Sequence, residues 1–87
     1  MREGPIPLNN HDDAALARQW RAGDREAVAV AAERFSKTLG AVAYAALGDH
    51  ALAEDVVQET FARAHRVIRT LKEDGKLASF LTGIARN

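Results

Sequence analysis

The stretch AEDVVQETFARAHRVIRTL, residues 53–71, decides the fold of this 87-residue chain. Its apolar side chains recur in alternating steps of four and three, which places them on one face of an α-helix with 3.6 residues per turn. These residues are Val57, Phe61, Ala64, Ile68 and Leu71, with Val56, Thr60 and Val67 widening the face on one flank. We therefore predict a central helix whose apolar face packs on a core.

The remaining arc of this helix has its charges sorted along the axis. Four acids, Asp49, Glu54, Asp55 and Glu59, come before four bases, Arg63, Arg66, Arg69 and Lys72. The helix dipole favours this order by roughly 0.3–1 kcal/mol per charge, and Glu59 with Arg63 forms an acid-base pair four residues apart. Neither effect explains Asp55 and Glu59 one turn apart beside Gln58, because like charges at that spacing repel. The residues alone leave open a solvated face or a docking face.

The composition predicts an all-α protein, a small bundle of three to four helices in one domain. Hydrophobic residues make up 47% of the chain, charged residues make up 28%, and no strand-length run alternates apolar with polar residues. Twelve bases balance twelve acids, so we expect poor binding to duplex DNA. The segment from Thr60 to Lys72 has four bases and no acid. It is either a patch for phosphate or an acidic protein, or an ordinary basic helix end.

Several classes of protein have no support in the sequence. There is no cysteine, no secretory signal at the start, and no apolar run longer than the seven residues from Ala41 to Leu47. We expect a cytoplasmic protein without membrane insertion. Glycine loops for phosphate, nucleophile elbows and HExxH motifs are missing, and His50 with Glu54 offers too few ligands for a metal. A surface ion pair is the better interpretation of His50 and Glu54, so we predict no enzyme, metal or cofactor.

Local signals divide the chain into a flexible leader, residues 1–10, and a helical domain, residues 11–87. Asn10 or Asp12 is expected to cap a first helix that carries Leu16 and Trp20 on its buried side and stops at Gly23. Asp24 then caps a second helix that reaches Phe35 or Leu47, with a kink or break between Ser36 and Gly40, where glycine costs about 1 kcal/mol relative to alanine. A Gly-Asp pair recurs at Gly48-Asp49 and starts the central helix.

After the central helix we expect a loop over Lys72–Lys76 and a final helix from Leu77 to Arg86. Leu77, Phe80, Leu81, Ile84 and Ala85 are predicted to face the core. The chain stops at Asn87 without a capping glycine. We therefore expect a fragment of a longer protein.

Three spaced signatures together resemble the second domain of bacterial sigma factors, specifically the extracytoplasmic-function group. They are Gly23-Asp24-x-x-Ala27, the run AEDVVQETFARA over residues 53–64, and the run FLTGIARN over residues 80–87. The central signature is specific, since it combines an acid, two aliphatic residues, Gln, a second acid and Phe at fixed spacing. The resemblance spans about Asp12 to Asn87 and implies a sigma region 2 type of helical bundle.

The resemblance implies that the central helix docks on the clamp helices of the RNA polymerase β′ subunit. The polymerase-binding residues are then Asp55, Gln58, Glu59 and Arg63, and the docking interpretation of the polar arc is favoured. The family also uses the following loop and helix to open the promoter minus-ten element and to hold a base of the single-stranded non-template strand. The DNA-binding residues implied here are Lys72, Lys76, Phe80, Arg86 and Asn87.

This sequence departs from the family pattern at the DNA-binding segment. Phe80 stands where Trp is usual, Thr82-Gly83 replaces Tyr-Arg, and His65 stands where Trp is common. An anti-sigma factor is a further partner that the resemblance implies. The alternative function is a helical protein-interaction domain, an anti-sigma partner or polymerase competitor, with no DNA role of its own.

Overall fold

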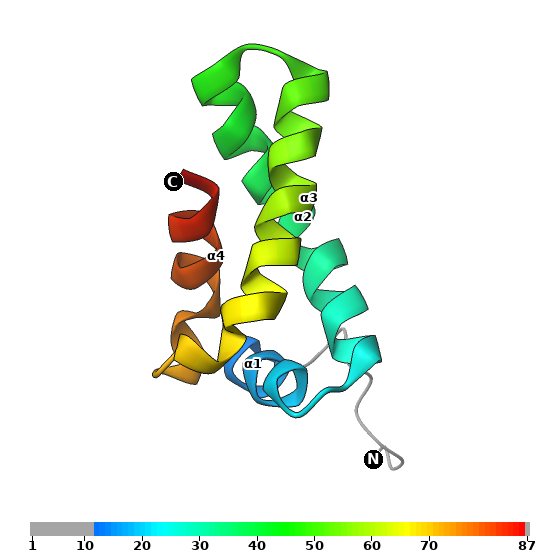
Figure 1. Ribbon diagram of the computed structural model, residues 1–87, viewed down its shortest axis with the longest axis vertical. Coiled ribbons are helices and arrows are strands. Elements are labelled where there is room, and N and C mark those ends of the chain that lie inside the picture. Colours follow the sequence, from blue (N-terminus) through cyan, green and yellow to red (C-terminus); the bar gives the residue numbers. More distant parts are fainter. Residues whose placement is uncertain (1–11, 87) are drawn as a thin grey trace, which may run out of the picture.

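The computed structural model describes residues 12–86, and every regular element in that range is helical (Figure 1). The elements are α1 (Asp13–Arg21), α2 (Arg25–Leu47), α3 (His50–Val67), the short 3-10 helices η2 (Ile68–Thr70) and η3 (Asp74–Lys76), and α4 (Leu77–Arg86). The predicted all-α bundle is confirmed. The predicted leader, the Asn10 cap and Asn87 lie outside the described residues.

An aspartate caps the N-terminus of each of the first three helices. Asp12 accepts a hydrogen bond from the Ala15 amide at 2.8 Å, Asp24 from the Glu26 amide at 2.9 Å, and Asp49 from the Leu52 amide at 3.0 Å. Glycine ends α1 and α2, because Gly23 and Gly48 adopt φ of 94° and 69°, a conformation that a side chain disfavours. The repeated Gly-Asp pair is therefore a stop followed by a start, as the sequence predicts.

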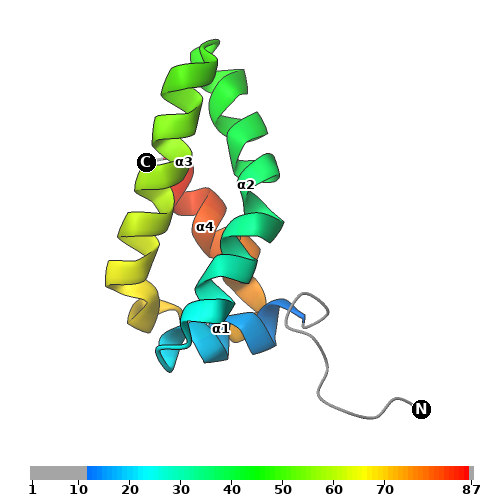
Figure 2. The ribbon, with the colours of Figure 1, turned by 90° about the vertical axis from the view of Figure 1, so that its right-hand side faces the viewer.

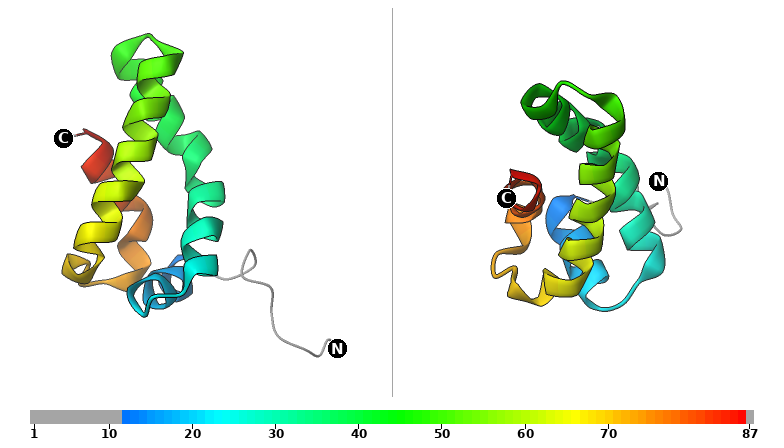
Figure 3. Two further views of the ribbon diagram at one scale, coloured as in Figure 1. Left: turned by 45° about the vertical axis from the view of Figure 1, so that its right-hand side comes forward. Right: turned by 45° about the horizontal axis from the view of Figure 1, so that its top comes forward.

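The helices α2 and α3 form a long antiparallel hairpin, and the other elements pack at its sides and open end (Figures 1 and 2). α1 lies across the open end, opposite the turn at Gly48, and α4 packs on both α2 and α3 (Figure 3). The molecule is elongated, with extents of 46 × 27 × 18 Å along its principal axes.

The core lies at the open end of the hairpin. Its largest fully buried side chains are Trp20 and Leu16 from α1, Leu39 from α2, and Leu77 and Leu81 from α4. Ala27, Ala31 and Ala64 are completely buried between them, and such small side chains let helix backbones approach closely. α1 and α4 thus close the open end of the hairpin.

The apolar face of α3 differs in detail from the prediction. Ala64, Ile68 and Leu71 are buried as expected, but Val57 and Phe61 are only half-buried and Val67 is 40% exposed. The centre of the buried arc lies at Thr60, which is 2% exposed and donates its hydroxyl to the Val56 carbonyl. The reason is that α3 packs against α2 on one side and α4 on the other.

One predicted helix boundary is confirmed and another is wrong. α2 is continuous from Arg25 to Leu47, the longer of the two predicted bounds, so no break occurs between Ser36 and Gly40. The Ser36 hydroxyl donates to the Ala32 carbonyl, a bond that accommodates curvature, and Figure 2 shows α2 as a curved helix. The central helix ends at Val67 instead of Leu71, because its last turn tightens into η2 and the Thr70 hydroxyl donates to the Val67 carbonyl at 2.7 Å.

Candidate functional site

The polar crest of α3, which we define as Asp55, Gln58 and Glu59, is exposed to solvent. Within residues 12–86, Asp55 and Gln58 make no hydrogen bond or ion pair. Glu59 meets Arg66 at 3.6 Å, instead of the predicted Arg63, and the two side chains are 61% and 64% exposed. An ion pair this exposed contributes little to stability. The crest therefore stays available to another molecule.

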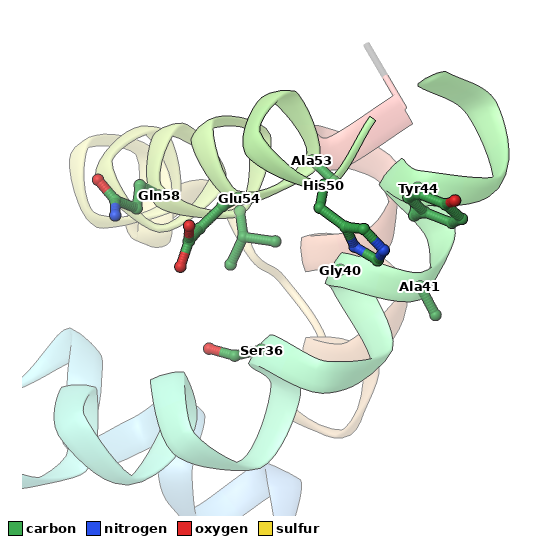
Figure 4. A pocket seen from close by; sticks show the side chains of 9 residues that line it. Ser36, Gly40, Ala41, Tyr44, His50, Ala53, Glu54 and Gln58 are labelled. Atoms are coloured by element: carbon green, nitrogen blue, oxygen red, sulfur yellow. The ribbon is translucent and has the colours of Figure 1, made fainter. Parts of the chain in front are cut away.

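Gln58 lies on the α2 side of the crest. With Glu54 it lines an open groove of about 600 Å³ between α2 and α3. Figure 4 shows both side chains on α3 across from Ser36 on α2, with Gly40 further along the groove. At the end near the hairpin turn, the ring of His50 stacks on Tyr44 with centroids 4.2 Å apart. Polar groups thus line this groove together with the small residues Gly40, Ala41 and Ala53.

Asp55 and Glu59 lie on the opposite side of the crest, together with the half-buried Arg63. They line a second groove, of about 380 Å³, between α3 and α4. Its apolar lining residues are Leu47, Leu52, Val56, Ile84 and Ala85. A partner that contacts all four predicted polymerase-binding residues must therefore straddle α3.

Exposed apolar side chains lie near the turn between α2 and α3. Tyr44, Leu47 and Leu52 are 41%, 46% and 51% exposed, and they account for three of the four large exposed hydrophobic residues in the described range. The exposure of Leu47 and Leu52 does not follow from the periodicity of the apolar residues. One signal was present, since Leu52 falls on the same helical face as Asp55 and Glu59 instead of on the apolar face.

The connection between α3 and α4 exposes both of its lysines, Lys72 and Lys76. It is not the irregular loop predicted, because Asp74–Lys76 forms η3. Arg86 is exposed at the far end of α4. Phe80 is half-buried and packs against the core cluster. The four described residues predicted to bind DNA therefore do not form one patch.

A family model for sigma-70 region 2 matches residues 31–87. The chain belongs to the sigma-70 region 2 family. Region 2 is the part of a sigma factor that takes part in RNA polymerase binding and promoter melting, and the family is one of transcription factor domains. Neither the curated proteins nor the solved structures give a significant match.

The family match covers α3, its crest and α4, and most of α2. α1 lies before the matched residues. In this sigma region 2 domain, the sequence-predicted polymerase-binding residues come from α3 alone, whereas Lys72, Lys76, Phe80 and Arg86 come from the connection and α4.

Other kinds of site find no support in residues 12–86. His50 stacks on Tyr44 and does not form the predicted ion pair with Glu54. No group of three or more potential metal ligands occurs among these residues. None of the helices described in this range has the length and apolar character needed to cross a membrane.

Proposed function

We propose that this domain docks on the clamp helices of the RNA polymerase β′ subunit through the polar crest of α3. The observation that carries the proposal is that Asp55 and Gln58 are exposed and have no partner within residues 12–86. The buried face of the same helix is fixed by α2 and α4. The backbone of the crest is therefore pre-organised, so binding costs little backbone conformational entropy.

The chemistry of the crest suits a partner with basic and amide groups. Asp55 and Glu59 supply two carboxylates, Gln58 supplies an amide, and Arg63 adds a guanidinium on the α4 side. Carboxylates form charge-assisted hydrogen bonds with Arg and Lys side chains. Such complementary charges fix the register of an interface more than they raise its affinity.

We also infer that the domain takes part in recognition and melting of the promoter minus-ten element as part of an extracytoplasmic-function sigma factor in the cytoplasm. The exposed lysines Lys72 and Lys76 would contact phosphates of the single-stranded non-template strand. Phe80 is only half-buried, and an aromatic ring can stack on an unpaired base. An anti-sigma factor that covers the crest would block polymerase binding.

The docking proposal is tested by titrating the chain with a peptide of the isolated β′ clamp helices. We expect Gln58→Ala combined with Glu59→Ala to weaken binding by about tenfold or more, because both groups lose their hydrogen bonds at the interface. Helicity measured by circular dichroism is expected to stay unchanged, since both side chains are exposed.

The matched control is Glu33→Ala, which removes an exposed acid from α2 outside both grooves. It is expected to leave the affinity for the peptide within about twofold. Unchanged affinity of the Gln58/Glu59 double variant would contradict the docking proposal. A second outcome would favour the alternative function, a protein-interaction domain. In that outcome polymerase binding depends on the crest, but the complex binds no single-stranded DNA.

A further inference from the structure

One arginine of α1 holds the connection between α3 and α4 in place. Arg21 Nη2 donates to Asp74 Oδ1 at 2.7 Å, and Arg21 Nη1 donates to the Leu71 carbonyl oxygen at 3.4 Å. Arg18, one turn earlier, approaches Asp74 Oδ2 at 3.9 Å. The side chains of Arg21 and Asp74 are 31% and 23% exposed. This pair is therefore more shielded from water than the pair between Glu59 and Arg66.

The contacts of Arg21 fall inside a segment whose two ends are already buried. Leu71 is 8% exposed and Leu77 is fully buried, and Asp74 is fixed between them by α1. The residues in between, Lys72, Glu73, Gly75 and Lys76, point into solvent. Three anchors over so short a segment leave its exposed lysines little freedom to move relative to the core.

The same contacts change the local charge. Within the connection, Lys72 and Lys76 balance Glu73 and Asp74, so the segment alone is neutral. Arg18 and Arg21 add two positive charges next to Asp74. Arg18 and Arg21 therefore offset the negative charge of Asp74, which would otherwise repel a phosphate that approaches Lys72 and Lys76.

We propose that Arg21 is a positioning residue for the connection between α3 and α4, the segment proposed above to contact promoter DNA. Through Asp74 and the Leu71 carbonyl it fixes Lys72 and Lys76 where they contact the phosphates of the unpaired strand. This inference rests on the proposed DNA role of that segment. Arg21 precedes residues 31–87, the range that the family model matches, and is 53 residues away from Asp74 in the chain.

The experiment compares Arg21→Ala and Asp74→Asn with the matched control Arg34→Ala. Arg34 Nη1 lies 3.3 Å from Asp13 Oδ1, and these side chains are 27% and 34% exposed. The control therefore also removes a half-exposed ion pair of α1, but one that joins α1 to α2. Any general loosening of α1 should appear in the control as well.

The first readout is hydrogen–deuterium exchange of the free chain. The Leu71 amide donates to the Ile68 carbonyl and the Lys76 amide to the Glu73 carbonyl, so both report on the order of the segment. We expect faster exchange of residues 71–76 in Arg21→Ala and Asp74→Asn, and wild-type exchange there in Arg34→Ala.

The second readout is affinity for single-stranded DNA in complex with RNA polymerase core. The wild-type complex first selects oligonucleotides from a random single-stranded pool, and each variant complex is then titrated with a selected oligonucleotide. We expect Arg21→Ala and Asp74→Asn each to weaken binding by about tenfold, with affinity for the polymerase core within about twofold of wild type.

Asp74→Asn separates positioning from simple charge. It removes a negative charge and frees two arginines, so a purely electrostatic role predicts tighter DNA binding, whereas positioning predicts weaker binding. Tighter binding, or an equal loss in Arg34→Ala, would overturn the inference while leaving the proposed function intact. A wild-type complex that selects no oligonucleotide would refute the DNA role itself and the inference with it.

Discussion

Trp20 is the largest fully buried side chain, and its one polar atom is satisfied at the edge of the core. Trp20 Nε1 donates to His65 Nδ1 at 3.1 Å, and the indole stacks with Phe61 and His65 at centroid distances of 6.4 and 6.5 Å. Indole nitrogen can only donate, so His65 Nδ1 must act as the acceptor, which assigns its proton to Nε2. A histidine on the exposed side of α3 thus completes the packing of a core residue from α1.

This contact predicts the effect of removing the imidazole. His65→Ala leaves the buried Trp20 N–H without its protein acceptor, and we expect the free energy of unfolding to fall by about 1–2 kcal/mol. Urea denaturation followed by circular dichroism measures the change. The exposed substitution Arg69→Ala is the control, with an expected change within about 0.5 kcal/mol. If His65→Ala costs as much in a Trp20→Phe background, the hydrogen bond is not the cause.

At the scale of the elements, two glycines of the hairpin have opposite roles. Gly48 ends α2 with φ of 69° and donates its amide to the Tyr44 carbonyl at 2.7 Å. Gly40 lies inside α2, where a Cβ would meet Val57 Cγ2 at 3.9 Å, an ordinary van der Waals distance. The hairpin therefore needs glycine at its turn but not at the point where α2 passes α3.

Alanine at each position tests this difference. Gly48→Ala is expected to lower the free energy of unfolding by about 1–2 kcal/mol, because a side chain is strained in the left-handed conformation. Gly40→Ala is expected to raise it by about 0.5–1 kcal/mol through its higher helix propensity. Thermal or urea denaturation of both variants gives the comparison. Destabilisation by Gly40→Ala would mean that the groove between α2 and α3 tolerates no methyl group.

These elements also explain how far the sequence could predict the fold and the site. The Asp caps, the Gly stops and the bounds of α4 follow from local chemistry, and the exposure of Asp55, Gln58 and Glu59 follows from helical spacing. The central turn of the buried arc at Thr60 does not, because it depends on where α2 and α4 pack. The contacts of Arg21 with Asp74 and of Trp20 with His65 join residues 53 and 45 positions apart, and no pattern in one sequence pairs them.

At the scale of the whole molecule, charge is separated along the hairpin. From Thr38 to Ala62 the chain contains Asp49, Glu54, Asp55 and Glu59 but no Lys or Arg. The bases Arg63, Arg66, Arg69, Lys72 and Lys76 follow along α3 and into the connection at the open end. The crest is therefore acidic, whereas the open end gathers bases, with Arg18 and Arg21 next to the neutral connection. We therefore expect the acidic crest to repel nucleic acid.

The same distribution predicts that the isolated chain binds duplex DNA weakly. The net charge is zero, and Arg86 stands at the opposite end of α4 from Lys76, so few phosphates can be neutralised at once. We expect binding to random duplex DNA weaker than about micromolar at physiological salt, with a slope of log K against log salt no steeper than about −3. Fluorescence anisotropy at several salt concentrations measures both. The control Asp55→Lys with Glu59→Lys raises the net charge from zero to about +4 and should bind more tightly with a steeper slope. Micromolar duplex binding by the wild-type chain would contradict the prediction. Such binding requires a continuous basic surface, whereas Lys76 and Arg86 lie at opposite ends of α4.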